Sequence, residues 1–254
     1  MPDKVIVDRE GSVLVITINR PEVRNAIDRA TADAIAAALD ELDRAAELTV
    51  GIITGADGTF CAGMDLKAFL AGERPSVPGR GFAGLAERRP AKPLIAAVEG
   101  AAVAGGFEIV LACDLVVASE TAVFGLPEVR RGLVAAGGGL LRLPERLPYH
   151  LAAEWALTGR SVPAAAAHAV HLVNRLVPAG EAVREALVLA AEIAANAPLA
   201  VRATKQILAQ APGWPTEAAF DRLRQISEPV RSSADAAEGA QAFAERRPPV
   251  WAAR

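Results

Sequence analysis

Two acidic side chains occupy positions where a fold commonly displays reactive groups. Glu108 lies in the first turn of a predicted helix, directly after Gly105-Gly106, and Glu128 follows Pro127. Acidic side chains are rarely buried without a partner, so an acid among apolar neighbours is paired, solvated or used in chemistry. Two carboxylates in one apolar pocket can hold a water between them, one acting as base and the other as acid. Such a pair suits the addition or removal of water.

The alternative is that each acid forms a buried ion pair with an arginine. Arg130, Arg131 and Arg142 are the candidates in this part of the sequence. For two arbitrary acids this is the more common arrangement. Here both acids lie at loop-to-helix junctions, where functional side chains are usually displayed. We therefore expect Glu108 and Glu128 to act as an acid/base pair.

Two glycine-rich loops, Ala62-Gly63-Met64 and Ala104-Gly105-Gly106, each follow a predicted buried strand. A strand that ends in glycines before a helix directs backbone N–H groups at one point, which favours a developing negative charge. Neither loop has the pattern of a phosphate-binding loop. The single G-x-G-x-x-G, at 79–84, has no strand before it, and G-x-S-x-G is absent. These observations exclude the usual dinucleotide-binding and serine hydrolase motifs.

The composition is that of a globular enzyme-sized chain. It has 254 residues, of which 52% are apolar, and a net charge of −3. That balance argues against a general nucleic-acid surface, and no apolar run is long enough to cross a membrane. The N-terminus has no signal-peptide pattern, and the cysteines and histidines lack the spacing of metal ligands. We expect a cytoplasmic protein with no metal, no nucleic-acid partner and no membrane partner.

Apolar periodicity predicts the elements that position these loops. Strands are expected at 5–8, 13–19, 50–54, 94–98, 115–118 and 172–177. A helix capped by Asp28 or Thr31 follows the first two strands, and 71–93 is predicted to be a mobile surface loop. Later helices are expected at 181–196, 199–210, 216–230 and 235–246. A strand-turn-helix unit recurs about four times before the helical C-terminal third, which indicates an α/β fold.

The motifs in this order resemble the crotonase (enoyl-CoA hydratase/isomerase) superfamily. The resemblance rests on Asn19-Arg20-Pro21, on residues 60–66, on Gly105-Gly106-Phe107-Glu108 with Cys113-Asp114, on residues 124–128 and on residues 235–246. It implies an α/β spiral of repeated strand-strand-helix turns with a helical C-terminal trimerisation region. On this reading residues 1–195 form the spiral core with the acyl-CoA site. Residues 196–254 form the helical region for oligomerisation, giving a homotrimer or a hexamer built as a dimer of trimers.

The resemblance also implies the roles of individual residues. The backbone N–H groups of Met64 and Gly105 would form an oxyanion hole for the thioester oxygen of an acyl-CoA, and Glu108 and Glu128 match the two hydratase glutamates. The remaining matches would bind CoA, namely Arg24, Ala62, Gly63, Asp65, Leu66 and Lys67, with Phe243 and Arg246 reaching the CoA of a neighbouring subunit. CoA is part of the substrate, and no further cofactor is expected.

Both glutamates are present, whereas isomerase-type members commonly keep only the acid that matches Glu128. We therefore expect a reversible enoyl-CoA hydratase of fatty acid or related acyl-CoA metabolism. Residues 135–139 read Ala-Ala-Gly-Gly-Gly and, with residues 126–131, resemble the carnitinyl-CoA dehydratase-like branch. A 3,2-enoyl-CoA isomerase, a carnitinyl-CoA dehydratase-type enzyme and a non-catalytic acyl-CoA-binding protein are the alternatives.

Overall fold

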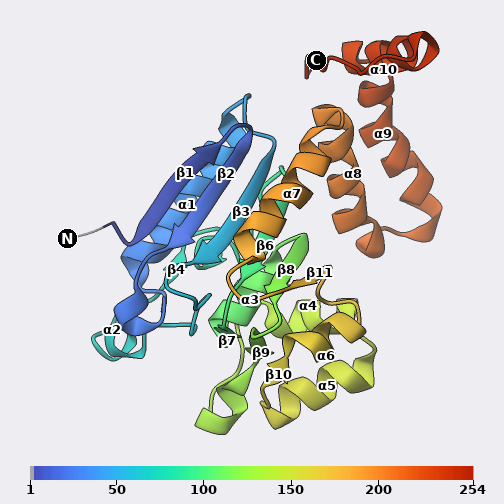
Figure 1. Cartoon of the computed structure of the whole chain (residues 1–254). Helices are drawn as coiled ribbons and strands as arrows, with labels where there is room; N and C mark the ends of the chain where they lie inside the picture. Colours follow the sequence, from blue (N-terminus) through green and yellow to red (C-terminus); the bar gives the residue numbers. More distant parts are fainter. Residues whose placement is uncertain (1–2, 254) are drawn as a thin grey trace.

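A six-stranded sheet forms the centre of the computed structural model, which describes residues 3–253 (Figure 1). The strand order is β1-β2-β3-β6-β8-β11, in which β1 and β2 are antiparallel and the other neighbours are parallel. The strands are β1 (Val5–Glu10), β2 (Val13–Ile18), β3 (Val50–Gly55), β6 (Leu94–Val98), β8 (Leu115–Ser119) and β11 (Arg175–Val177). The parallel strands β3 and β6 are buried on both faces, which is why their sequences are continuous apolar runs.

A second, smaller sheet turns this arrangement into a spiral. It has the order β10-β9-β7 and consists of β7 (Ala101–Val103), β9 (Val123–Gly125) and β10 (Val162–Pro163). The chain passes from β6 to β7 and then into α3 (Gly105–Ala112), and next from β8 to β9 and into the 3-10 helix η2 (Pro127–Arg131). Each turn therefore places one strand in each sheet before a helix. This confirms the predicted α/β spiral of strand-strand-helix turns.

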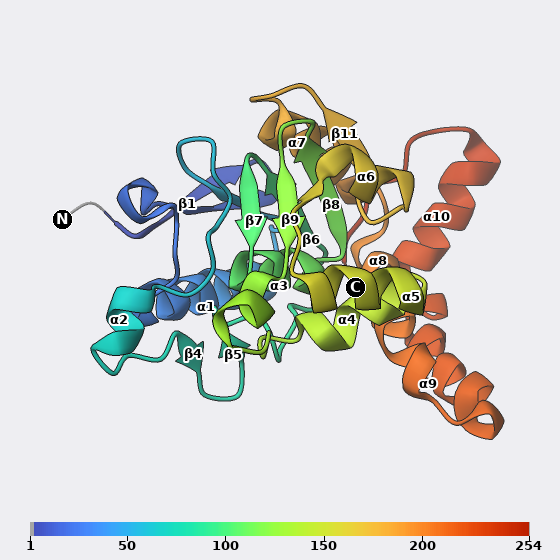
Figure 2. The same ribbon diagram turned by 90° about the horizontal axis from the view of Figure 1, so that it is seen from below.

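Helices cover both faces of the main sheet (Figure 2). On one face, α7 (Ala182–Ala194) packs small side chains such as Ala186 against Ile52, Ile95 and Val117. On the other face, α1 (Arg29–Arg44) and α3 enclose the larger hydrophobic core. Alanines on α7 allow the helix to approach the sheet closely. The remaining helices of this body are α2 (Leu66–Leu70), α4 (Gly139–Arg146), α5 (Tyr149–Thr158), α6 (Ala164–Ala169) and the 3-10 helix η1 (Pro21–Val23).

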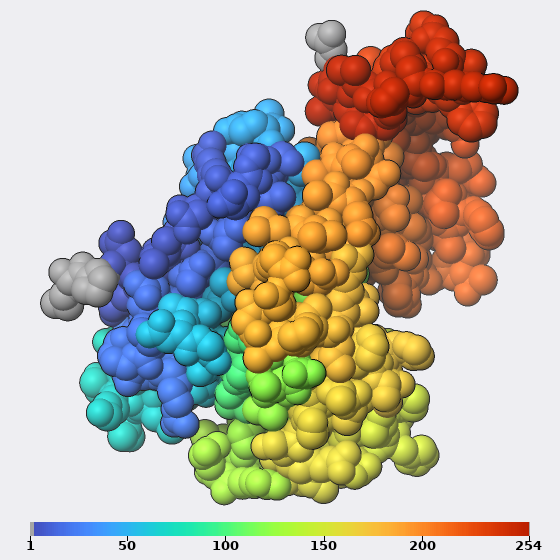
Figure 3. Space-filling view, in the orientation of Figure 1, coloured from blue at the N-terminus to red at the C-terminus, as the bar shows by residue number. Residues whose placement is uncertain are grey.

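The last three helices form a lobe at one side of the molecule (Figure 3). They are α8 (Pro198–Gln210), α9 (Ala219–Arg231) and α10 (Ala234–Glu245), with 3-10 turns η3 (Ala211–Gly213) and η4 (Thr216–Ala218) between α8 and α9. The chain bends by 107° between α7 and the α8 segment. Lys205 Nζ contacts Asp114 Oδ2 at 2.6 Å, and Trp251 Nε1 donates to the Ala195 carbonyl at 2.8 Å. These contacts tie the lobe to the body.

Most of the predicted elements form, and two expectations are wrong. The strand expected at 172–177 begins only at Arg175, because the N–H groups of Leu172 and Val173 bond back to the Ala167 carbonyl. The segment 71–93 is not only a surface loop. It contains the hairpin β4 (Ser76–Val77) and β5 (Gly81–Phe82), and Leu85 lies in the core. Of the two caps proposed for α1, the Asp28 side chain is the one that accepts the Thr31 N–H, at 2.8 Å.

Within residues 3–253 no single helix is long and apolar enough to span a membrane. The bent pair of α7 and the α8 segment passes a length and composition test only when the two are taken together.

Candidate active site

Three consecutive turns of the spiral end at one place. Cys61 pairs with Ala102 in parallel, and Ala102 in β7 pairs with Phe124 in β9. The segments that follow these paired residues carry, in the same order, Met64, Gly105 with Glu108, and Glu128. Parallel strands direct the chain that leaves them to the same edge of a sheet. The repeat thus brings together four residues that are up to 64 positions apart in the sequence.

Backbone pairing on both sides holds Met64 in place. Ile27 donates its N–H to the Gly63 carbonyl at 2.8 Å, and Asp65 donates to the Ile27 carbonyl at 2.9 Å. Gly63 has φ 96°, and a Cβ on it would lie 2.9 Å from the Ala104 Cβ and 3.1 Å from the Gly105 nitrogen. The two glycine loops therefore touch. Within residues 3–253 the N–H groups of Met64 and Gly105 have no hydrogen-bond acceptor.

The turn into α3 stores backbone strain. Ala104, the N-cap residue, has φ 52° and ψ −128°, a region that residues with a Cβ rarely adopt. A Cβ on Gly105 would collide with the Phe82 ring, and one on Gly106 with the Cys61 carbonyl. Glycine is therefore required at position 106, where the obstacle is backbone, and a side chain at position 105 would have to displace the Phe82 ring. The strained turn directs the N–H groups at the start of α3 away from the helix, where they can receive an anionic oxygen.

Glu108 is almost fully buried, with 4% of its surface exposed. Its Oε1 accepts the Gly139 N–H at 2.9 Å. A Cβ on Gly137 would lie 2.5 Å from Oε2, so the 135–139 turn wraps closely around the carboxylate. Burial raises the pKa of Glu108, and the backbone donors Gly139 and Gly137 and the charge of Arg142 oppose that rise. Glu108 is thus a buried acid with defined backbone partners.

Glu128 is the second residue of the 3-10 helix η2, directly after Pro127, and has fewer backbone partners than Glu108. Its Oε2 is buried and has no hydrogen-bond partner among residues 3–253. Burial raises the pKa of Glu128 and the negative charge of Glu108 raises it further, while a hydrogen bond from its own backbone N–H and the charge of Arg131 lower it. The ion pairs found among residues 3–253 include neither glutamate. The alternative of two structural ion pairs with arginine is therefore wrong, and the two acids are electrostatically coupled to each other.

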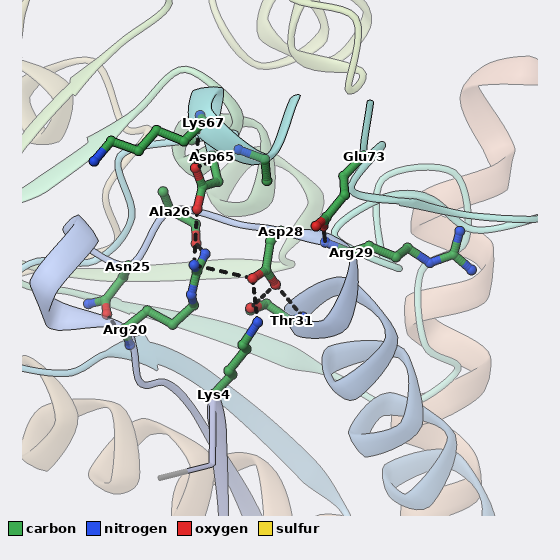
Figure 4. A network of polar contacts seen from close by, with 12 residues as sticks. Lys4, Arg20, Asn25, Ala26, Asp28, Arg29, Thr31, Asp65, Lys67 and Glu73 are labelled. Carbon is green, nitrogen blue, oxygen red and sulfur yellow. Dashed lines mark hydrogen bonds and ion pairs between the residues drawn. The ribbon is translucent and has the colours of Figure 1, made fainter. Parts of the chain in front are cut away.

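A buried ionic network supports the Met64 loop from behind (Figure 4). Arg20 Nη2 contacts Asp65 Oδ2 at 2.9 Å and Asp28 Oδ2 at 3.2 Å, and Lys4 Nζ reaches the same Asp28 oxygen at 2.5 Å. Burial raises the pKa of Asp28, but the bonds from Lys4 and Thr31 lower it to about 2. Asp65 also caps α2 by accepting the N–H groups of Lys67 and Ala68. Its side chain is therefore committed to positioning the loop.

The other residues matched to CoA contacts lie on two parts of the chain. The Arg24 carbonyl accepts the Ala62 N–H at 3.0 Å, which places Arg24 beside the loop that carries Met64. Leu66 and Lys67 are exposed on α2, and Figure 4 shows the Lys67 amine pointing away from Asp65. Phe243 and Arg246 lie on or just after α10, at the opposite end of the molecule from α2 (Figure 1). Within one chain they do not join the site, and all these CoA contacts stay predictions.

Sequence reasoning missed Gly137, Gly139 and Arg142 as parts of the site. The sequence points to residues 135–139 as a glycine turn and as a resemblance to the carnitinyl-CoA dehydratase-like branch, whereas in the structure the N–H groups of this run bond Glu108. The sequence offers Arg142 only as an ion-pair partner, whereas the structure places it against Gly138. The sequence signal that could have indicated this part of the site is the run Gly137–Gly139 followed by Arg142, which lies three residues after Gly139.

Thiol and metal chemistry have no support at this site. Cys61 and Cys113 are buried, and burial raises the pKa of each thiol to about 12, so both stay protonated. In the part of the chain that the structure describes, no three His, Cys, Asp or Glu side chains are grouped as metal ligands. The chemistry that the arrangement supports is proton transfer by the glutamates beside two free backbone N–H groups.

Comparison with known proteins gives consistent results. A family model described as enoyl-CoA hydratase/isomerase matches residues 8–254. The enoyl-CoA hydratase EchA19 of Mycobacterium tuberculosis is 43% identical over 259 residues, which cover 98% of this chain and 96% of that protein. The carnitinyl-CoA dehydratase of Salmonella typhi is also 43% identical, over 263 residues that cover 100% of both.

Solved structures show the same fold. The enoyl-CoA hydratase EchA1 from Mycobacterium marinum superposes with a TM-score of 0.98 at 54% identity, covering 99% of this chain and 100% of that one. A carnitinyl-CoA hydratase from Mycobacterium avium superposes with a TM-score of 0.80 at 44% identity, covering 100% of both chains.

Proposed function

Because the chain belongs to the enoyl-CoA hydratase/isomerase family, we propose that it is an enoyl-CoA hydratase, a lyase that adds water reversibly across the 2,3-double bond of an enoyl-CoA thioester. The observation that carries the proposal is the pairing of a buried glutamate, Glu108, with a half-buried one, Glu128, whose Oε2 is buried. Among residues 3–253 neither forms an ion pair, and both follow strands that pair side by side in the small sheet. An isomerase needs one such acid, whereas water addition needs a base for water and an acid for carbon.

The N–H groups of Met64 and Gly105 would hold the thioester oxygen of the substrate. When water attacks C3, negative charge moves through C2 to that oxygen and forms an enolate. Two preorganised N–H donors stabilise the enolate more than the neutral thioester, which lowers the barrier. Loss of one such donor typically costs about 2.7 to 4 kcal/mol of transition-state stabilisation.

The surroundings of the two acids assign their roles. Glu108 accepts backbone N–H groups and faces Arg142, which favours its ionised form, so it is the base that removes a proton from water. Glu128 has a buried oxygen without a partner and is repelled by Glu108, which favours its protonated form. It donates its proton to C2. Water oxygen ends on C3, and exchange with solvent resets the pair. These steps use protein groups and water alone and call for no further cofactor.

The reverse reaction, loss of water from a 3-hydroxyacyl-CoA, uses the same groups in exchanged roles. Relatives named carnitinyl-CoA dehydratase support this direction as a second candidate. A panel assay separates the possibilities. The protein is incubated with 2-enoyl-CoA, 3-enoyl-CoA and carnitinyl-CoA thioesters in ¹⁸O-labelled water. We expect ¹⁸O in a 3-hydroxyacyl product from 2-enoyl-CoA. Double-bond migration alone would indicate an isomerase, and tight binding without turnover of any member would indicate an acyl-CoA-binding protein.

We also propose that the protein works as a homotrimer or a hexamer of two trimers in the cytoplasm. The C-terminal lobe exposes large apolar side chains that a monomer would leave in water, among them Leu208, Phe220, Phe243 and Val250. Exposed apolar groups gathered on one lobe favour association. Both cysteines are buried and unpaired, as is usual in a reducing compartment.

A further inference from the structure

Arg142 is a half-buried arginine with unused hydrogen-bond donors beside the candidate site. It lies on α4, three residues after Gly139, whose N–H bonds Glu108 at 2.9 Å. Its Nη2 donates to the Ala86 carbonyl. Its Nε and Nη1 are buried and have no hydrogen-bond partner in residues 3–253. Burying a guanidinium with two unused donors is costly unless its charge is employed nearby.

The guanidinium packs against the turn that encloses Glu108. A Cβ on Gly138, which has φ 94°, would collide with Arg142 Nη1. Gly138 lies between Gly137 and Gly139, the two residues whose missing side chains leave room for the Glu108 carboxylate. One guanidinium nitrogen of Arg142, Nη1, therefore lies against the middle of the 135–139 turn. The other terminal nitrogen, Nη2, is held by its bond to the Ala86 carbonyl. A displacement of the guanidinium would move the turn and its N–H donors together.

The charges around the pair can be named. Glu108 faces Glu128 from η2 and Arg142 from α4. Arg142 faces Arg89 from the 83–93 segment, Glu145 on its own helix and Cys113 at the end of α3. Burial lowers the pKa of Arg142 and the charge of Arg89 lowers it further, whereas Glu145, Glu108 and Cys113 raise it. Among residues 3–253, Arg142 is the positive charge that opposes the upward shift in the pKa of Glu108.

We infer that Arg142 is a positioning residue of the hydration site, which holds the 135–139 turn around Glu108 and supplies the positive charge that keeps this carboxylate ionised as the base for water. The inference rests on the proposed function for its consequence in catalysis. It concerns Glu108 directly, so it can be tested without turnover.

Arg146 provides a matched control on the same helix. It lies one turn further along α4 and is also half-buried, and its Nη2 donates to a backbone carbonyl, that of Cys113, at 3.3 Å. Burial lowers the pKa of Arg146 as it does that of Arg142. Its charge is not among those that act on Glu108. A purely structural effect of losing a buried arginine should appear in both variants, whereas an effect on Glu108 should appear only at position 142.

The test is the titration of the Glu108 carboxyl carbon by ¹³C NMR in protein labelled at the glutamate carboxyls. The signal is assigned by its loss in Glu108→Gln. In Arg142→Gln we expect it to titrate at higher pH than in the wild type, and in Arg146→Gln at the wild-type pH. Arg142→Lys keeps the charge and should titrate near the wild-type pH. If Arg142→Gln does not fold, Arg142→Met fills the site without charge and should give the same upward shift, because apolar replacement of a buried ion is often tolerated.

Activity gives a second readout. The acid limb of the pH profile of kcat should move upward in Arg142→Gln but not in Arg146→Gln, and kcat should fall by about tenfold or more while KM changes little. An unchanged Glu108 titration in the neutral variants, or an equal shift in Arg146→Gln, overturns the inference. If the wild type adds no water to any enoyl-CoA, the proposed function fails, and the NMR titration still decides the role of Arg142.

Discussion

Ala104 donates its backbone N–H to the Gly125 carbonyl over 2.9 Å. This bond joins the chain just before α3 to the end of β9, extending the parallel pairing of Val103 with Gly125. Glu108 comes four residues after Ala104, and Glu128 comes three residues after Gly125. The separation of the two acids is therefore set by main-chain pairing and by two short helical turns. Two groups that exchange protons with one substrate must be held at a fixed separation, and this rigid main-chain framework provides it.

The contact between the two glycine loops should be sensitive to a single methyl group. Gly63→Ala would crowd the Ala104 Cβ and the Gly105 nitrogen, so we expect kcat/KM to fall by about 10²-fold or more, as for loss of an oxyanion donor. Gly58→Ala is the control, because Gly58 also has positive φ, 68°, but an added Cβ meets nothing within 4 Å. Both variants should lose stability in denaturant unfolding because both positions have positive φ, and Gly63→Ala should lose more because its Cβ also crowds Ala104 and Gly105. Equal kcat/KM values for the two would contradict this account of the hole.

The network behind Met64 should carry much of the stability of the loop. In Arg20→Gln the carboxylates of Asp28 and Asp65 lose a shared partner in a place where all three side chains are at most 11% exposed. Breaking a buried pair costs about 3 to 5 kcal/mol. Arg29→Gln breaks an exposed pair with Asp33, and we expect a loss of about 0.5 kcal/mol or less. Urea unfolding at neutral pH measures both. If the free energy of unfolding falls by a similar amount in Arg20→Gln and Arg29→Gln, burial of the Arg20 network does not add to the stability of the protein.

The glutamates should weaken the fold at the pH at which they work. Burial raises the pKa of Glu108 and of Glu128 above the unfolded value, so the folded chain binds more protons as they titrate. Stability is then lost as pH rises from the unfolded pKa through the folded one. Glu108→Gln and Glu128→Gln remove that loss, so their Tm advantage over the wild type should grow from about pH 4.5 upward and then level off.

Glu238→Gln is the control of opposite sign for that titration. The hydrogen bonds from Arg247 and from the Val250 N–H lower the pKa of Glu238 to about 2, so its contribution is present at neutral pH and is lost only as pH falls toward that value. This variant should not raise Tm at neutral pH. A Tm advantage of the Glu108 and Glu128 variants that does not change with pH would contradict the assigned shifts.

Phe243 and Arg246 should act on the site of a neighbouring subunit. Phe243 is 87% exposed on α10, far from the site of its own chain (Figure 1). In the double variant Phe243→Ala/Arg246→Ala we expect KM for enoyl-CoA to rise and kcat to change little. Mixed oligomers of this variant with the inactive Glu128→Gln protein should regain a low KM. In them, Phe243 and Arg246 of a Glu128→Gln subunit would bind the CoA held in the intact active site of a double-variant subunit. No recovery on mixing, or monomers in sedimentation, would contradict a shared site.

The spiral could be predicted because local and global signals agree. The apolar run 94–98, the glycines 105–106 and the acid at 108 each indicate one step of a strand-turn-helix unit, and all three steps form. The wrong boundary at 172–174 arose because an apolar run fits either a strand or a turn packed on the core. In the structure the N–H groups of Leu172 and Val173 bond to the Ala167 carbonyl, and the apolar pattern of the sequence does not predict this partner.

The candidate site was predictable only in part, for a similar reason. Glu108 and Glu128 are conspicuous because a charge in an apolar segment needs an explanation. The surroundings of Glu108 are not, because Gly137 and Gly139 contribute through backbone N–H groups and Arg142 reaches Ala86 across 56 residues. Contacts of this kind depend on how separate loops meet. They become visible only in three dimensions.

The most direct test of the acid/base pair is the rate of water addition by Glu108→Gln and Glu128→Gln across a panel of 2-enoyl-CoA thioesters, with double-bond migration of 3-enoyl-CoA measured in parallel. Each substitution keeps the size of the side chain and removes one proton-transfer group. Each variant should lose about 10²- to 10⁴-fold in hydration while still binding acyl-CoA. Hydration at the wild-type rate in either variant would contradict the account. It would also be contradicted if the wild type added no water and double-bond migration of 3-enoyl-CoA continued in Glu108→Gln.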